Sequence, residues 1–258
     1  MFQPRLATSA GGCVSRDLFA GPLAGFAKTL VLDKARPVIP LPELLRGDTL
    51  DRLLLQVYGP ELMPEQLPVL VSQWMKYYAM QLIPPVVVAS LVHGVSWSLS
   101  LDRLGFALDE RGLLDGVRVE GEACEASRSD EAFERFAPLL DNLQQVIERL
   151  SAYGNVAPGV LWGNAGDYLE TCLRQLSAAS EVSLDPGYGL LRERLRSNGR
   201  RNPLFNAITY TKGVNGIEGV DGQSVRQRRS CCLSYRVERV GRCEHCPLQW
   251  ITPTHIDV

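Results

Sequence analysis

Histidine is scarce in this chain, and no apolar run is long enough to cross a bilayer. The three histidines, His93, His245 and His255, are too few for a His-rich metal site. The longest apolar run, residues 82–92, contains two prolines and is much shorter than the roughly 20 residues that a membrane-spanning helix needs. The first residues lack the sustained apolar stretch of a signal peptide. We therefore expect a cytoplasmic protein.

Motifs for nucleotide binding and for nucleophilic hydrolysis are also missing. There is no G-x-x-x-x-G-K-S/T phosphate loop, no G-x-G-x-x-G after a predicted strand and no G-x-S-x-G elbow. The sequence thus shows no nicotinamide, flavin or ATP site of its own. If the protein carries electrons, a partner must supply them.

Charge is unevenly distributed along the chain. Residues 1–188 have a net charge of −8 and residues 189–258 one of +6. Six arginines fall between positions 226 and 242. They could raise the reduction potential of a nearby metal centre, or dock an acidic electron carrier or an anionic ligand. We expect no nucleic-acid partner, because the excess is modest and no recognition motif accompanies it.

Those arginines flank a cluster of cysteines. Cys231, Cys232, Cys243 and Cys246 lie within sixteen positions, whereas the chain's other three cysteines, Cys13, Cys124 and Cys172, are scattered. Clustered thiols in a chain without an export signal usually bind metal rather than form disulfides. Four thiolates suit tetrahedral zinc or an iron–sulfur cluster. Only one half of the motif has the C-x2-C form of zinc sites, and adjacent cysteines chelate one small ion poorly.

The pattern C-C-x10-C-x2-C resembles the C-terminal signature of the FhuF-like ferric-siderophore reductases. The flanking stretches 228–235 and 246–248 agree with it, as do residues 159–165 and 201–205. The resemblance covers roughly residues 65–250, and residues 1–64 match no family that we can name.

The resemblance implies a [2Fe–2S] cluster held by Cys231, Cys232, Cys243 and Cys246. It implies a one-electron reductase that releases iron from ferric siderophores as Fe²⁺. The electron donor would be an external protein such as a ferredoxin or a flavin reductase. Association with the periphery of the inner membrane, where ferric siderophores arrive, is left open.

Two other functions compete with this one. A zinc-stabilised binding or adaptor module would have no redox role, and the purified protein would be colourless. A non-catalytic siderophore binder, or a relative of siderophore synthetases, is a third hypothesis. Synthetases need a nucleotide site, and the sequence offers no phosphate-binding loop.

Several residues beyond the cysteines are candidates for binding substrate or partner: Arg226, Arg228, Arg229, Arg242, Trp162 and Asn164. For Trp162 and Asn164 the alternative is core packing and a helix cap. We interpret Asp167 and Glu170 as part of a solvated helix face and assign no catalysis to them.

The hydrophobic pattern predicts mostly helices. We expect helices at 41–58, 63–93 (one helix, or two broken at Pro84-Pro85), 129–153, 158–177 and 186–196. Residues 95–119 alternate as in a small antiparallel meander, and a polar loop follows at 120–130. Glycines recur every third residue at 213–222, which favours a surface loop that is either a hinge for the cysteine segment or a plain insertion.

The expected architecture is α+β, with a mostly helical body, a small antiparallel sheet and a C-terminal cluster-binding segment. We divide the chain into an N-terminal segment of unknown role, a reductase-like body and a cluster segment: residues 1–64, 65–224 and 225–258.

Overall fold

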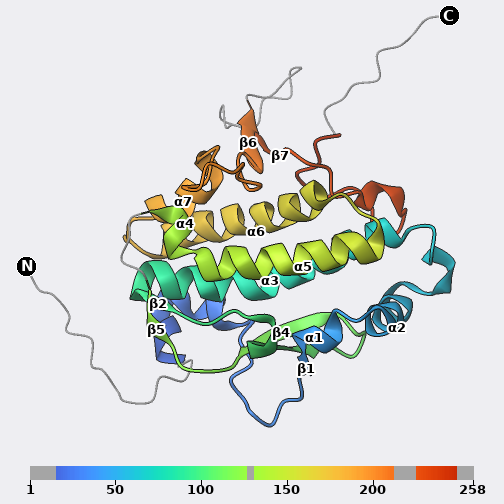
Figure 1. Ribbon diagram of the computed structural model, residues 1–258, viewed down its shortest axis with the longest axis horizontal. Coiled ribbons are helices and arrows are strands. Elements are labelled where there is room, and N and C mark those ends of the chain that lie inside the picture. The colour runs from blue at the N-terminus through green and yellow to red at the C-terminus, as the bar shows by residue number, and fades with distance from the viewer. Residues whose placement is uncertain (1–15, 127–130, 212–224, 249–258) are drawn as a thin grey trace, which may run out of the picture.

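The computed structural model describes residues 16–126, 131–211 and 225–248, and long helices dominate it (Figure 1). The α-helices are α1 (Leu41–Leu44), α2 (Gly47–Tyr58), α3 (Leu67–His93), α4 (Ala132–Arg135), α5 (Ala137–Gly154), α6 (Pro158–Ala179) and α7 (Asp185–Arg192). The strands are β1 (Ile39–Pro40), β2 (Val95–Ser96), β3 (Leu104–Leu108), β4 (Leu114–Val119), β5 (Cys124–Glu125), β6 (Ile208–Thr211) and β7 (Val225–Arg228). All strand pairs are antiparallel. The predicted α+β class is confirmed.

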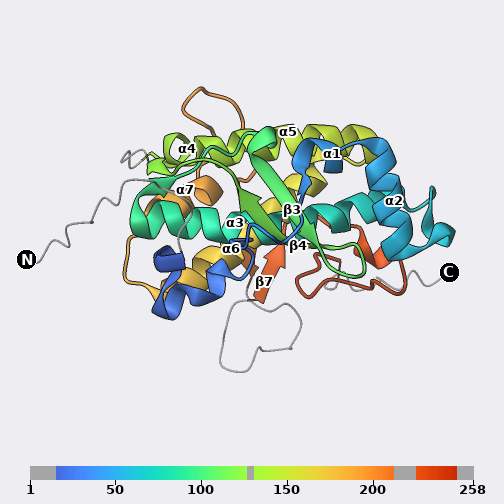
Figure 2. The same cartoon turned by 90° about the horizontal axis from the view of Figure 1, so that it is seen from below.

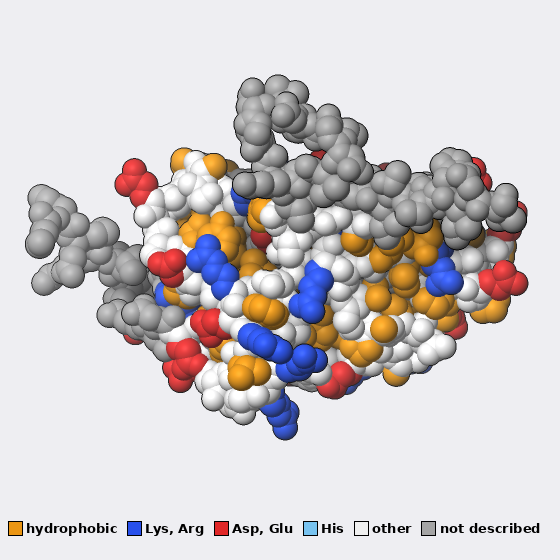
Figure 3. Space-filling model, turned by 90° about the horizontal axis from the view of Figure 1, so that it is seen from above, with side chains coloured by type: hydrophobic (Ala, Val, Ile, Leu, Met, Phe, Trp, Pro, Cys, Tyr) orange, Lys and Arg blue, Asp and Glu red, His pale blue; other side chains and the backbone are white. Residues whose placement is uncertain are grey.

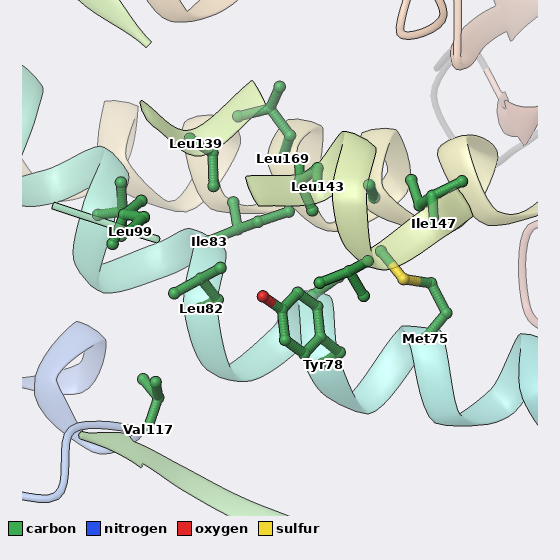
Figure 4. Close-up of a cluster of buried hydrophobic side chains, with 14 of the residues drawn as sticks. Met75, Tyr78, Leu82, Ile83, Leu99, Val117, Leu139, Leu143, Ile147 and Leu169 are labelled. Atoms are coloured by element: carbon green, nitrogen blue, oxygen red, sulfur yellow. The ribbon is translucent and has the colours of Figure 1, made fainter. Parts of the chain in front are cut away.

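Helix α3 is the centre of the molecule. Helices α5 and α6 pack on one side of it and the β3–β4 hairpin on the other (Figures 1 and 2). In α3, Met75 points toward Ile147 of α5, and Ile83 points toward Leu143 of α5 and Leu169 of α6 (Figure 4). A helix that is apolar all round belongs in a core or in a membrane. By length and composition α3 could span a bilayer, which corrects the expectation that no segment is long enough, but 72% of its apolar window is buried inside the protein.

The two prolines do not break α3. Pro84 and Pro85 lie inside one continuous helix, so the alternative of two helices is wrong. An interior proline costs about 3 kcal/mol or more. Burial of the adjacent Ile83 and Val87 against neighbouring elements offsets that loss. The helix ends at Gly94, which has a positive φ of 63°, as its position after the periodic stretch predicts.

Other predicted helices are confirmed with changed boundaries. The helix expected at 41–58 is divided into α1 and α2, because Leu45 and Arg46 leave the helical conformation between them. The helix expected from 129 starts at α4, whose last turn leads into α5 through Phe136. Helix α7 ends at Arg192, four residues earlier than predicted.

The sheet differs from the predicted meander in its third strand. β3 and β4 form the expected hairpin, but the strand beside β3 is β1, far upstream. The alternating stretch 95–101 contributes only β2, which pairs with β5 in the polar loop. Alternation indicated a half-buried extended segment correctly. It could not indicate the partner, because strand pairing depends on contacts between distant residues.

The described part of residues 1–64 packs into the same core as the rest of the chain. Phe19, Phe26, Leu41 and Leu44 are buried in the cluster that surrounds α3. The predicted boundary near residue 64 therefore runs through one hydrophobic core. The glycine-rich stretch 213–222, between β6 and β7, lies outside the described residues.

Close packing between α6 and the β6 segment gives a test of this arrangement. A methyl group at Gly166 would lie 2.3 Å from the Cβ of Ala207. We expect Gly166→Ala to lower the free energy of unfolding by about 1–3 kcal/mol through overpacking, although alanine favours helices. Gly159→Ala, on the same helix, meets nothing within 4 Å and should not destabilise the protein. Urea denaturation of both variants checks this, and equal stability of the two would contradict the packing.

Candidate metal centre

The cysteine segment begins where β7 ends and is fixed by backbone hydrogen bonds. The amide of Arg228 donates to the carbonyl of His245 at 3.0 Å, and the amide of Cys246 donates to the carbonyl of Cys243 at 3.1 Å. Leu233, which directly precedes the short 3-10 helix Ser234–Arg236, has a positive φ of 66°, which is uncommon for residues other than glycine. This turn lets the Leu233 amide donate to the sulfur of Cys231 at 3.3 Å.

All four cysteines of the motif lie in this segment. Cys232 and Cys246 are buried, while Cys231 and Cys243 are partly exposed. The thiol of Cys243 is hydrogen-bonded to Cys232, and Cys231 interacts electrostatically with Cys232 and Cys246. The fold therefore brings together thiols that are up to fifteen positions apart.

Cys232 has the most strongly charged surroundings. Its hydrogen bond to Cys243 lowers the pKa of Cys232 and raises the pKa of Cys243, because one of the two thiols retains the proton. The ammonium of Lys76 lies 3.2 Å from the Cys232 sulfur and the hydroxyl of Ser234 lies 2.8 Å from it. Both favour the thiolate, the form that binds metal. Burial raises the pKa of Cys231.

This donor set fits an iron–sulfur cluster. Four thiolates are what all-cysteine ligation of two irons requires, and the Lys76 ammonium and the Leu233 amide provide the donors to sulfur that such clusters use.

A buried ionic network attaches β7 to α6. Arg226 donates to Glu170 at 2.5 Å and lies 2.8 Å from a carboxylate oxygen of Asp167. Arg228, which is 1% exposed, lies 3.2 Å from the other Asp167 oxygen and donates to the side-chain oxygen of Asn164. Residues two apart on a strand share a face, and residues three apart on a helix do too. Two arginines on one strand face thus meet three polar groups on one helix face.

The network continues from α6 to the cysteines. The side-chain amide of Asn164 donates to the carbonyl and the hydroxyl of Ser72 on α3, at 2.8 and 2.9 Å. The Ser72 hydroxyl in turn donates to the carbonyl of Cys232 at 2.8 Å. A continuous series of hydrogen bonds therefore leads from Arg228 to the vicinal pair.

These contacts change the roles expected for several residues. Arg226 and Arg228 have internal partners, so they hold the segment in place rather than face a ligand in solution. Glu170 is only 4% exposed, which corrects its assignment to a solvated helix face; its other carboxylate oxygen accepts from Tyr210. Asp167 is likewise corrected, because it pairs with both arginines.

Trp162 and Asn164 both lie inside α6 and are buried. Trp162 belongs to the hydrophobic core, and Asn164 bridges Ser72 and Arg228. Asn164 is not a helix cap, since α6 already begins at Pro158.

Two of the candidate arginines are exposed. Arg229 donates to the carbonyl of Phe205 at 3.2 Å, and Arg242 donates to the carbonyl of Leu248 at 2.9 Å. Their guanidinium groups remain accessible to a ligand or partner.

Helix α3 contributes to the site in a way that was not predicted from the sequence. Ser72 and Lys76 are one helical turn apart and both contact Cys232, although 156 or more positions separate them from it. A polar pair at this spacing on one face of a largely buried helix is a signal that could have indicated a polar neighbour.

The scattered cysteines do not join the motif in the described residues. Cys124 is exposed on β5, and Cys172 is buried in α6, where burial raises its pKa to about 12. Cys13 lies outside the described residues.

Comparison with known proteins gives this arrangement a context. Residues 72–213 match the family described as ferric iron reductase FhuF-like transporter, and residues 228–248 match the FhuF 2Fe-2S C-terminal domain. The second span contains the four clustered cysteines, so the predicted [2Fe–2S] cofactor is confirmed for this segment. The chain is also similar to the ferric siderophore reductase of Escherichia coli (strain K12), with 26% identity over 197 residues, which are 74% of this chain and 69% of that protein.

Proposed function

The chain belongs to the FhuF-like ferric iron reductase family, and on that premise we propose that it reduces ferric siderophores by one electron and releases iron as Fe²⁺. The observation that carries the proposal is the cysteine segment itself. Four thiols are gathered in the span that matches the 2Fe–2S domain, and buried hydrogen bonds fix them to α3 and α6.

The chemistry follows from the hardness of the two iron states. Fe³⁺ is held tightly by hard oxygen donors, and Fe²⁺ is held far more weakly. A [2Fe–2S] cluster supplies electrons one at a time, which matches this step. The ferric ion would gain one electron from the protein. An external electron carrier of the ferredoxin or flavin-reductase class would then supply the protein with another electron. We place this reaction in the cytoplasm, where thiols stay reduced, with a peripheral association at the inner membrane as part of the proposal.

The protein's own residues have defined tasks in this scheme. We propose that Cys231, Cys232, Cys243 and Cys246 hold the cluster. Lys76 and the Leu233 amide place positive charge and an N–H group at the sulfurs. Arg228 and Asn164 keep the segment seated on the helices. Cys231 is partly exposed, so this side of the centre is open to a substrate.

An optical and EPR spectrum of freshly purified protein, before and after dithionite, tests the proposal. Visible absorption that bleaches on reduction, with an S = 1/2 signal, is expected. The reduced protein should then convert a ferric siderophore to Fe²⁺, trapped by a ferrous chelator. A colourless protein that contains zinc and no iron would instead indicate the binding or adaptor module.

Lys76 should tune the reduction potential. Its ammonium lies 3.2 Å from the sulfur of Cys232 and favours the reduced state, which is more negative by one charge. We expect Lys76→Met to make the potential more negative, as measured by an EPR-monitored redox titration. Lys34→Met removes an exposed lysine far from the cysteines and should leave the potential unchanged. A potential that stays constant or rises in Lys76→Met would contradict this role.

A further inference from the structure

A cationic cavity lies directly beside the cysteine motif. It has a volume of about 390 Å³ and its lining includes Arg194, Arg201, Arg229, Ser230 and Phe205. Ser230 immediately precedes Cys231, so the wall of the cavity continues into the candidate centre. Figure 3 shows the face that carries α6 and the C-terminal segment, where several Lys and Arg side chains gather around apolar surface.

The three arginines of this cavity differ from the two in the buried network. Arg194, Arg201 and Arg229 are exposed, and within the described residues none has a carboxylate within 4 Å. Among the described residues that line the cavity, none is acidic. Three uncompensated positive charges around one concave site attract an anion of comparable charge. Guanidinium groups bind carboxylates and other planar oxygen anions through two parallel hydrogen bonds.

The shape of the cavity depends on close packing at α6. A methyl group at Gly163 would lie 3.0 Å from the Cβ of Ser230, so the helix backbone itself forms this wall. Phe205 and Pro203 add apolar surface to the lining. A ligand with both an anionic and an apolar part, as an organic metal chelate has, fits this combination.

Three other cavities of the described structure suit such a ligand less well, and the widest of them, about 610 Å³, has a single arginine, Arg135, together with Asp185. One of equal volume, about 390 Å³, lies beside β4 and contains Glu120 as well as Lys34 and Arg118. It lies by the sheet, on the other side of α3 from β6 and β7 (Figure 1). A smaller one of about 280 Å³ contains Arg111 and Arg239, but Arg239 already donates to the carbonyl of Tyr58 and stacks on its ring.

We propose that the cavity of Arg194, Arg201 and Arg229 binds an anionic ferric chelate, with carboxylate or catecholate groups, in preference to an uncharged tris-hydroxamate complex. This inference rests on the proposed function and specifies its substrate class. Three hydroxamates neutralise Fe³⁺, whereas citrate and catecholate ligands leave the complex negative. The arginines thus select by net charge, and the adjacent Cys231 places the bound iron next to the candidate centre.

Calorimetric titration of the full, cluster-containing chain with gallium(III) citrate tests this binding without any electron transfer, because gallium(III) replaces Fe³⁺ and is not reduced by the protein. We expect the double variant Arg201→Gln/Arg229→Gln to bind the complex at least about tenfold more weakly, since two charge-assisted contacts are lost. Neutral gallium(III) acetohydroxamate should bind the native protein more weakly than the citrate complex does.

A matched control removes the same charge elsewhere. Arg52 on α2 and Arg149 on α5 are exposed and outside the cavity. Arg52→Gln/Arg149→Gln should bind gallium(III) citrate within about twofold of the native protein, because exposed charges at a distance are screened by salt. An equal loss in both double variants would overturn the proposal, since it would reflect net charge alone. Binding of citrate without metal as tight as that of the chelate would overturn it too.

The reduction assay separates this inference from the proposed function. If ferric citrate and ferric acetohydroxamate are both reduced, but with equal KM values that the Arg201/Arg229 variant does not alter, the cavity proposal fails and the reductase stands. If the cluster-containing native protein reduces neither complex, the proposed function fails, and the gallium titrations alone decide whether the cavity binds anionic chelates.

Discussion

Cys232→Ser and Cys246→Ser should each give a protein that purifies without visible colour and reduces no ferric siderophore. Both sulfurs are buried, so no outside thiol can readily replace them. A serine hydroxyl stays protonated at neutral pH and is a much harder ligand than a thiolate. Removing a group that only hydrogen-bonds to a metal ligand weakens metal binding by about 10–100-fold. Removing a ligand itself should weaken metal binding even more. Iron content, visible absorption and chelator-trapped Fe²⁺ are the measurements.

The remaining cysteines provide the controls for this experiment. Cys124→Ser changes an exposed thiol on β5, and Cys172→Ala changes a buried thiol whose pKa is raised to about 12, which keeps it protonated. Both variants should retain colour and activity. Full colour in Cys232→Ser, or its loss in Cys124→Ser, would contradict the assignment of the four ligands.

A metal site could be predicted from the sequence because its signal is local, and the family resemblance then favoured a [2Fe–2S] cluster over zinc. Four cysteines within sixteen positions form a pattern that can be recognised without knowledge of the fold. The surroundings of Cys232 could not be predicted in the same way. Lys76 and Ser72 lie on a helix more than 150 positions upstream, and only the packing of α3 against the C-terminal segment brings them to the sulfur and the carbonyl.

The fold shows the same division between local and distant signals. The apolar stripe of α5 and the terminating Gly94 of α3 were predictable because both depend on neighbouring residues. The continuity of α3 through Pro84 and Pro85 was not, because it depends on burial by other elements. The pairing of β1 with β3 was likewise set by tertiary contacts.

The arginines near the cysteines show why charge alone misleads. The sequence made Arg226 and Arg228 candidates for binding a substrate or partner, and left open that they raise the potential of a nearby metal centre. The structure instead pairs them with Asp167, Glu170 and Asn164 across β7 and α6. The spacings that match, two on a strand and three on a helix, become informative only when both elements are known to face each other.

Because this pairing is buried, removing one of its arginines should strongly destabilise the protein. Arg228→Met keeps much of the side chain's volume but leaves Asn164 without its donor and Asp167 with one arginine instead of two. Removing one partner of a buried ion pair usually costs about 3–5 kcal/mol, and because Arg226 still pairs with Asp167 we expect a loss of about 3 kcal/mol. For a chain of this size that lowers Tm by about 6–12 °C. Thermal denaturation followed by circular dichroism measures it.

The neighbouring arginine makes the control for this prediction. Arg229 is exposed and makes one surface hydrogen bond, so Arg229→Ala should change the free energy of unfolding by no more than about 0.5 kcal/mol.

The Arg228→Met variant should also lose its cluster faster on dilution into a chelator, because Arg228, Asn164 and Ser72 together hold the carbonyl of Cys232. If Arg228→Met is as stable as Arg229→Ala, the guanidinium does not hold the segment. If it is less stable but keeps its cluster as long as the native protein does, the network supports the fold without positioning the cysteines. Only a joint loss of stability and of cluster retention agrees with a segment whose ligands are held in place from α3 and α6.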